Sequence, residues 1–241
     1  MMSHKKIHRF LVEYMPANSI GDTVTIDDSR IAKQINRVLK IHPGEAIQVF
    51  ADLPAQAGEG QQYTMTLTAT TDFSLTGTII EITKVPLVPR TIIAAISIVK
   101  GDAFELMVQK LTEIGVTTIV PLITSRTVKQ SIRLNRLQAI SDEAVEQCGG
   151  IQRVTITEPM TLKQCFEQYP FDSVVLDPIS TNTEIKNFSD TMVCYIGPEG
   201  GWDEHDEEII DSFKPQHVKI TDRVLRTETA AILGVYTLLW K

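Results

Sequence analysis

The chain has 241 residues, of which 43% are hydrophobic and 22% charged, so it is long enough for one large or two modest hydrophobic cores. No apolar run approaches the ~20 residues that span a bilayer, and none follows the charged N-terminal residues, so we expect neither a membrane helix nor a secretory signal. The three cysteines lack paired spacing, which favours a reducing cytoplasm, and together with the five scattered histidines they give no pattern of metal ligands. The net charge of −7 does not decide for or against a nucleic-acid partner.

The first third of the chain contains short apolar strands and one helix. The expected strands are His8–Met15, Thr23–Asp27, Ala46–Phe50, Tyr63–Ala69 and Leu75–Thr83. A helix is expected over Arg30–Leu39, after the capping residues Asp27–Ser29, and a hairpin loop over Ala51–Gln61. Several strands with a single short helix indicate a small β-barrel.

The pattern changes at Val85–Pro89, where two prolines interrupt pairing, and we expect a domain boundary there, between residues 1–85 and 86–241. The expected strands beyond it are Thr91–Ile98, Thr117–Pro121, Val154–Thr157, Asp172–Leu176, Met192–Ile196 and His217–Ile220. The expected helices are Asp102–Ile114, Ile132–Gln147, Leu162–Gln168, Asp203–Ser212 and Thr229–Trp240. Such alternation predicts an α/β fold, with a largely parallel sheet covered by helices on both faces.

Two segments near the C-terminus predict a ligand site. Ile196–Trp202 (Ile-Gly-Pro-Glu-Gly-Gly-Trp) follows an apolar strand and precedes an acidic helix, so it forms a glycine-rich loop whose backbone is open to close approach. Alone, such a loop is more often only a tight turn. Arg223–Ala230 (Arg-Val-Leu-Arg-Thr-Glu-Thr-Ala) follows and leads into the last helix.

With other short segments, this pair resembles the ribosomal RNA small subunit methyltransferase E family, which are SPOUT-type S-adenosylmethionine-dependent enzymes that methylate N3 of a uridine in 16S rRNA. The other segments are His8–Phe10, Gln34–Lys40, Lys100–Asp102, Gln109–Val116 and Glu143–Gly149. The resemblance covers nearly the whole chain. It implies a PUA-like β-barrel in residues 1–85, a SPOUT methyltransferase domain with a C-terminal trefoil knot in 86–241, a homodimer, and S-adenosylmethionine as cofactor.

The resemblance also implies a cofactor site at two strand ends, the glycine-rich loop and the turn before the last helix. Its residues are Leu176, Ile196, Gly197, Pro198, Glu199, Gly200, Gly201, Ile220, Val224, Leu225, Arg226, Thr229 and Ala230. Arg226 and Glu228 are the expected catalytic residues, with Arg226 a bidentate donor to a carbonyl or phosphate and Glu228 the base for the uracil N3 proton. Alternatively, Thr227 caps the helix and Arg226 and Glu228 pair with other charges.

Two positions depart from the family pattern. Ile220-Thr221 stands where the family usually has Leu-Gly, and the missing glycine removes backbone freedom beside the expected cofactor. Gly150 stands where the family usually has arginine, and Arg153 is the nearest arginine that follows.

Basic residues recur at a spacing that places them on one helix face, namely Arg30, Lys33, Arg37 and Lys40. Arg126 and Arg133 belong to a second stripe of the same spacing, and Arg9 could extend the first. One such stripe is more often a solvated face, but two in an acidic chain favour phosphate contacts. The resemblance implies 16S rRNA of the small ribosomal subunit as the partner that supplies these phosphates.

Two other functions stay open at this point. One is a non-catalytic RNA-binding or ribosome-assembly factor of the same fold, and the other is a methyltransferase acting on a ribose 2′-hydroxyl or another base. The apolar last helix suits a homodimer interface and a buried core helix equally well.

Overall fold

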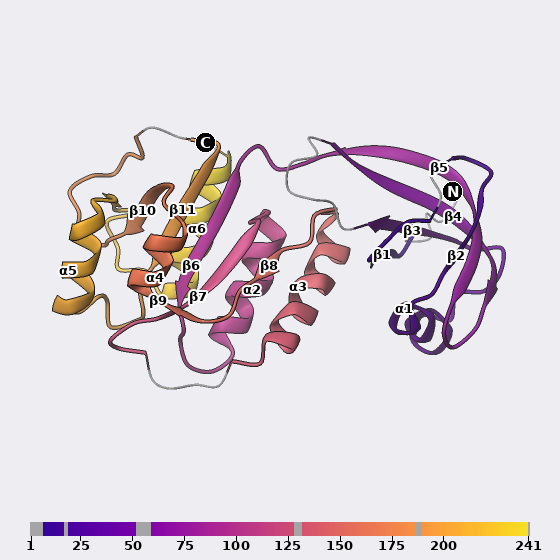
Figure 1. Cartoon of the computed structure of the whole chain (residues 1–241), viewed down its shortest axis with the longest axis horizontal. Coiled ribbons are helices and arrows are strands. Elements are labelled where there is room, and N and C mark those ends of the chain that lie inside the picture. The colour runs from indigo at the N-terminus through magenta and orange to yellow at the C-terminus, as the bar shows by residue number, and fades with distance from the viewer. Residues whose placement is uncertain (1–6, 17–18, 52–58, 128–131, 187–188, 241) are drawn as a thin grey trace. The chain divides into compact units, whose positions relative to one another are not determined.

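The computed structural model describes residues 7–16, 19–51, 59–127, 132–186 and 189–240, which form two compact units (Figure 1). The first unit contains the described residues up to Leu87 together with Val145–Arg153. The second contains Val88–Ala144 and the described residues from Val154 onward. Within these described ranges, none of the helices has the length and apolar composition to cross a membrane.

A five-stranded sheet in the order β1-β3-β4-β5-β2 forms the first unit. Its strands are β1 (Arg9–Val12), β2 (Thr23–Ile26), β3 (Ala46–Ala51), β4 (Glu59–Thr70) and β5 (Leu75–Pro86). β1 pairs with β3 in parallel, and the other neighbours are antiparallel. Alternate residues such as Ile47, Val49, Met65 and Leu67 are buried in one core, as the period-two pattern predicts.

The single helix of this unit begins as α1 (Ser29–Lys33) and continues as the wider π-helical turn η1 (Gln34–Leu39). The Asp28 carboxylate caps it by accepting hydrogen bonds from the backbone N–H groups of Arg30 (2.8 Å) and Ile31 (3.0 Å). Ile31 and Ile35 are fully buried. The predicted helix is confirmed. Its π-helical part was not predicted, because the spacing of apolar residues does not distinguish a π-helical turn from an α-helical one.

Several strand boundaries differ from the sequence prediction, and β1, for example, ends at Val12 rather than Met15. β4 begins at Glu59, within the expected hairpin loop, and β5 extends to Pro86 rather than Thr83. The two strands pair from Glu59 opposite Pro86 to Thr70 opposite Leu75. Backbone pairing continues past the apolar pattern because ladder hydrogen bonds do not require apolar side chains. Residues 52–58 of the expected loop lie outside the described residues.

The second unit is an α/β layer structure. Its strands are β6 (Thr91–Ser97), β7 (Thr118–Ile123), β8 (Thr155–Ile156), β9 (Met160–Thr161), β10 (Asp172–Leu176), β11 (Thr191–Ile196) and β12 (Gln216–Val218). Its helices are α2 (Ala103–Ile114), α3 (Leu134–Cys148, whose last residues belong to the first unit), α4 (Leu162–Gln168), α5 (Glu204–Phe213) and α6 (Thr227–Trp240). The strand order is β12-β10-β11-β6-β7-β8, with β9 also on β7, and every pair is parallel.

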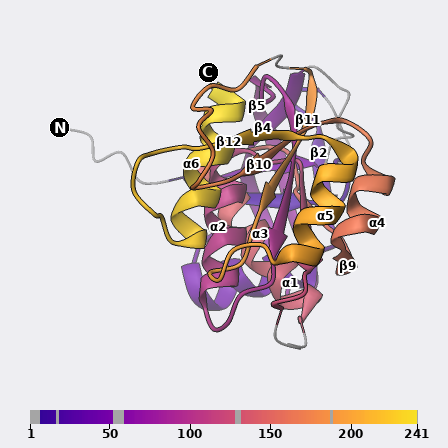
Figure 2. The same cartoon turned by 90° about the vertical axis from the view of Figure 1, so that its left-hand side faces the viewer.

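Helices cover both faces of this sheet, as the alternation predicts (Figure 2). α2 and α6 lie on one face, where Ile92, Ala94 and Ile96 of β6 join their core. α4 and α5 lie on the other face, which receives Ile93 and Ala95 of the same strand. The short strand β9 was not predicted, because two residues carry no periodic signal.

Candidate functional site

Three neighbouring strands of the second unit end at the same edge of the sheet. β10 lies between β12 and β11, and its Leu176 and Val175 are paired with Val218 and Tyr195. Because all three strands are parallel, the segments that follow them emerge together. Ligands of open α/β sheets bind at this carboxyl edge.

A small pocket of ≈ 60 Å³ lies at this edge. Its lining residues come from the ends of β10 and β12, the turn before α6 and the first turns of α6, namely Leu176, Asp177, Pro178, Val218, Ile220, Thr221, Arg223, Leu225 and Ala230. Ligand pockets typically hold ~300–1,000 Å³. The pocket is therefore smaller than a typical ligand site.

Four of the residues expected at the cofactor line this pocket, namely Leu176, Ile220, Leu225 and Ala230. Val224 and Arg226, on the same turn, do not line it, and Val224 is 86% exposed. Ile196, Thr229 and the loop Gly197–Gly201 also lie outside its lining. The structure thus brings the strand ends and the final turn together, while the loop occupies the neighbouring strand end.

Asp177 is the acidic residue of the lining. Its Oδ1 accepts a hydrogen bond from the Ile179 N–H (2.9 Å), and its Oδ2 lies 3.2 Å from His217 Nδ1. Its own N–H donates to the Val218 carbonyl (2.9 Å). These contacts fix the carboxylate at the pocket. The contact between His217 and Asp177 was not predicted from the sequence. The two residues lie 40 positions apart, and no sequence motif links them.

The glycine-rich loop uses its glycines for different purposes. Only Gly201 among them has a positive φ, +71°, and its N–H donates to the Pro198 carbonyl (2.9 Å). At Gly197, a Cβ would stand 3.0 Å from the Trp202 ring, so the missing side chain makes room for the indole. Pro198 is buried and Glu199 is exposed.

The two expected catalytic residues flank the start of α6. The Arg226 side chain is 87% exposed and that of Glu228 is 22% exposed, with Nη1 and Oε1 4.0 Å apart. Glu228 lies in the first turn of the helix, where the macrodipole favours a carboxylate. A separation of 4.0 Å is an ion pair at the distance limit, so Arg226 is not held firmly by Glu228.

The departures from the family pattern have different surroundings. Ile220 and Thr221 both line the pocket, and Ile220 also packs against the core under α6. Gly149 has φ +88°, and the Gly150 carbonyl accepts a hydrogen bond from Arg9 Nη2 (2.9 Å). Gly150 is therefore part of the first unit's internal hydrogen bonding, and Arg153 in the same segment is partly buried.

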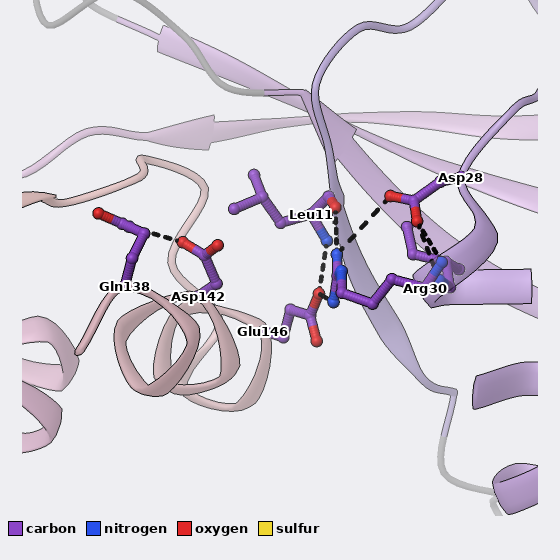
Figure 3. A network of polar contacts seen from close by, with 7 residues as sticks. Leu11, Asp28, Arg30, Gln138, Asp142 and Glu146 are labelled. Carbon is purple, nitrogen blue, oxygen red and sulfur yellow. Dashed lines mark hydrogen bonds and ion pairs between the residues drawn. The ribbon is translucent and has the colours of Figure 1, made fainter. Parts of the chain in front are cut away.

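Arg30, whose side chain is 51% exposed, belongs to a polar network of the first unit (Figure 3). Its Nη1 donates to Glu146 Oε1 (3.1 Å) and its Nη2 to the Leu11 carbonyl (2.9 Å). The Leu11 N–H donates to the same Glu146 oxygen (3.0 Å), and the Glu146 side chain is only 5% exposed. Removing Arg30 would leave a buried carboxylate short of a charged partner, which is costly.

Arg9 is similarly engaged. Its guanidinium lies over the Phe50 ring and donates to Gln62 (2.9 Å) and Gly150 (2.9 Å). Burial lowers its pKa from the usual arginine value, against the opposing charge of Glu146. The residue is thus half-buried among structural contacts.

The other expected basic residues are exposed. Arg37 pairs with Asp72 (2.5 Å) at the surface, and Lys33 and Lys40 are exposed beside it on the helix. Arg133 is exposed, whereas Arg126 donates hydrogen bonds from Nη1 to the carbonyls of Gly200 and Gly201. The stripe on α1 and η1 therefore contains free and paired cations in about equal number.

The final helix is apolar on more than its buried face. Ala231, Val235, Leu238 and Leu239 are buried in the core beneath the sheet. Leu233, Tyr236 and Trp240 are 39%, 50% and 54% exposed and recur at a spacing that places them on one outer face. An exposed apolar stripe of this kind is typical of an interaction surface.

Comparison with known protein families identifies the protein family of this chain. Residues 86–238 match the model of the RNA methyltransferase domain. The chain belongs to this family. This RNA methyltransferase is 29% identical over 231 residues to ribosomal RNA small subunit methyltransferase E of Synechocystis, an alignment covering 91% of this chain and 74% of that one. It is 30% identical over 150 residues to the protein of that name from Mesomycoplasma hyopneumoniae, covering 58% of this chain and 66% of the relative. The resemblance noted from the motifs is thus confirmed.

Solved structures agree with this assignment. Ribosomal RNA small subunit methyltransferase E from Neisseria gonorrhoeae, crystallised with S-adenosyl methionine, superposes with a TM-score of 0.84 at 28% identity and covers 96% of each chain. A methyltransferase from Legionella pneumophila shares the fold, with a TM-score of 0.84 at 24% identity. The cofactor expected for the RNA methyltransferase agrees with the molecule bound in the Neisseria structure.

Proposed function

We propose that this RNA methyltransferase transfers a methyl group from S-adenosylmethionine to N3 of a uridine in 16S ribosomal RNA. The observation that carries the proposal is the convergence of Leu176, Ile220, Leu225 and Ala230 on one pocket at the carboxyl edge of the sheet. Leu225 and Ala230 come from one of the segments through which the sequence resembles the methyltransferase E family, and the resemblance implies Leu176 and Ile220 as donor-site residues.

The residues of the pocket fit the donor. Leucine, isoleucine and valine side chains suit the faces of an adenine ring, and the fixed Asp177 carboxylate can accept hydrogen bonds from ribose hydroxyls. The donor would supply an electrophilic methyl group on a positively charged sulfur. We propose that Gly197–Gly201 and the turn carrying Arg226 and Thr229 close around the remainder of the molecule, with the exposed side chain of Val224 directed away from it.

The protein must also handle the uracil N3 proton. We propose Glu228 as the proton acceptor, because its carboxylate is three-quarters shielded and stands at the start of α6, beside the pocket residues Leu225 and Ala230. Arg226, exposed and only loosely paired, is free to donate two hydrogen bonds to a carbonyl or phosphate of the RNA. Holding N3 in line with the methyl group would supply most of the acceleration.

We propose that residues 1–85 form a PUA-like RNA-binding domain and residues 86–241 the SPOUT catalytic domain with its knot. The first proposal is supported by a five-stranded sheet with one helix between β2 and β3. The knot is proposed from the resemblance to the methyltransferase E family alone. Lys33, Arg37, Lys40 and Arg133, all exposed, are the cations we assign to RNA phosphates.

A homodimer completes the proposal. Support comes from the exposed stripe Leu233, Tyr236 and Trp240 on α6, which a second copy of the helix would cover. Its substrate, bacterial ribosomal RNA, would place the reaction in the cytoplasm.

The decisive test of the reaction is nucleoside mass spectrometry of ribosomal RNA from a strain that lacks the gene. Loss of 3-methyluridine from 16S rRNA, restored by the wild-type gene, is the expected result. Loss of a 2′-O-methylated nucleoside instead would assign the chain to a different methyl acceptor. An unchanged set of modified nucleosides would favour a non-catalytic assembly factor.

A further inference from the structure

The segment that follows β7 forms a tight turn in the second unit. The Thr127 N–H donates to the Thr124 carbonyl (3.0 Å), and the Thr124 N–H donates to Thr127 Oγ1 (2.9 Å). These two bonds close the turn and place Ser125 and Arg126 at its tip. The tip is therefore a defined structure from which two polar side chains reach other segments.

Ser125 anchors the turn to the start of α5. Its N–H lies 3.3 Å from both carboxylate oxygens of Asp206, and its Oγ donates to Oδ1 (3.2 Å). Asp206 is only 2% exposed, and its own N–H donates to the capping carboxylate of Asp203 (2.9 Å). A buried carboxylate is costly without hydrogen-bond donors, so this anchor is firmly required by the fold.

Arg126 extends from the anchored turn to the glycine-rich loop. Its Nη1 donates to the carbonyl oxygens of Gly200 and of Gly201, the latter at 3.3 Å. A Cβ at Gly200 would stand 3.3 Å from Arg126 Cδ, so the glycine also leaves room for the arginine stem. One guanidinium thus contacts two successive peptide groups of the loop.

A loop with three glycines loses much conformational freedom when it adopts a single shape. Hydrogen bonds from a charged donor are stronger than neutral ones and so can offset that loss. Arg126 is also a counter-charge to the acidic start of α5. The pKa of Asp203 is held below its usual range, mainly by the Asp206 N–H and further by Ser125 and the charge of Arg126.

We propose that Arg126 is a positioning residue of the methyl-donor site, which fixes the loop Gly197–Gly201 by binding two of its carbonyl groups. The identity of the donor rests on the proposed function, whereas the ordering of the loop does not. This role differs from the RNA contact that the basic stripe suggests for Arg126. Both loop contacts use Nη1, so the loop is the partner that the structure gives for this guanidinium.

The experiment compares Arg126→Ala and Arg126→Lys with the control Lys110→Ala, which removes a positive charge from α2 at a lysine that pairs with Glu113 and has no assigned role. The first readout is hydrogen exchange of the peptide 197–202 in the protein alone. Arg126→Ala should speed its exchange about tenfold, Arg126→Lys less, and Lys110→Ala not at all. Wild-type exchange in Arg126→Ala would overturn the proposal.

The second readout is the Kd for S-adenosylmethionine by calorimetry without RNA. Arg126→Ala should raise it about tenfold, with partial recovery in Arg126→Lys. An unchanged Kd together with a shallower salt dependence of RNA binding would overturn the proposal in favour of a phosphate contact. If the wild-type protein binds no donor, the proposed function fails, and the exchange result alone decides the role of Arg126. If Arg126→Ala does not fold, the intermediate exchange rate predicted for Arg126→Lys is the deciding result.

Discussion

Gly234 of α6 lies so close to Leu176 at the end of β10 that a Cβ at position 234 would stand 2.5 Å from Leu176 Cδ1. A glycine in the middle of a helix costs ~1 kcal/mol relative to alanine. Its presence in α6 is explained by this approach, because the helix could not otherwise pack at that depth. Leu176 also lines the pocket, so the packing of α6 sets the shape of the site.

Replacing Gly234 with alanine should therefore destabilise the protein, despite the better helix propensity. The added methyl group must displace Leu176, and overpacking of this kind costs ~1–3 kcal/mol. We expect a lower midpoint in urea unfolding and a weaker affinity for S-adenosylmethionine. Leu176→Ala combined with Gly234→Ala should recover part of the lost stability, since the two substitutions are coupled. A Gly234→Ala protein that is more stable and binds normally would refute the steric explanation.

Glu228→Gln tests the proposed proton acceptor. The amide retains the shape of the side chain but does not accept a proton at neutral pH, so kcat should fall ~100-fold or more while donor affinity is kept. Steady-state methylation of small-subunit RNA over a range of pH measures both quantities. Glu167→Gln, at a glutamate of α4 whose side chain is 55% exposed, is the control and should leave kcat unchanged. A wild-type rate in Glu228→Gln at every pH would exclude Glu228 as the base.

Lys33→Glu tests the RNA-binding surface on α1. Loss of one phosphate contact should weaken RNA binding and reduce the slope of log K against log salt by roughly 0.7–0.9. Filter binding at several salt concentrations supplies the slope. Lys163→Glu makes the same charge change at a lysine of α4 whose side chain is 65% exposed, and it should alter neither quantity. If both variants weakened RNA binding equally, the net charge of the protein, and not a contact at Lys33, would determine RNA affinity.

The thiols should differ sharply in reactivity. Cys148 is exposed, whereas burial raises the pKa of Cys165 to about 11 and that of Cys194 to about 12. The thiolate is the reactive form, so at pH 8 a thiol reagent should modify one cysteine in the native protein and all three after denaturation. Rapid reaction of two or three thiols in the folded protein would contradict the burial of β11 and α4.

The raised pKa values of Cys165 and Cys194 also determine how the stability of the protein changes with pH. Both folded-state pKa values lie above that of an unfolded thiol, ~8.5. Their contribution to the free energy of unfolding is thus complete below about pH 8.5 and falls as the pH rises towards 11 and 12. Urea unfolding of Cys194→Ala and wild type across this range should show a smaller alkaline loss in the variant.

Much of the α/β unit could be predicted from the sequence because its elements have strong local signals. β6 and β11 are continuous apolar runs, and α5 begins at a capping aspartate with acidic residues in its first turn. The resemblance to the methyltransferase E family implied Leu225 and Ala230 as site residues, and the structure places both at the pocket.

Long-range contacts had no such signal. Residues Val145–Arg153 belong to the same unit as the N-terminal residues, and Glu146 forms hydrogen bonds with Arg30 and Leu11 there. The sequence spacing of these residues does not indicate those contacts. The basic stripe gave Arg30 and Arg126 the same expected role as Lys33, because periodicity reports a helix face or a charge pattern but not hydrogen-bond partners. The hydrogen bonds from Arg126 to two carbonyl groups of the loop could be recognised only in the tertiary structure.

Isothermal titration calorimetry with S-adenosylmethionine tests the central claim most directly, using Leu225→Asp and Val224→Asp as a matched pair. Leu225 lines the pocket, whereas its neighbour Val224 is 86% exposed and does not. We predict one donor bound per wild-type chain, binding lost in Leu225→Asp and largely kept in Val224→Asp. A folded wild-type protein that binds no donor, or a pair of variants that bind equally well, would contradict a donor site at this edge of the sheet.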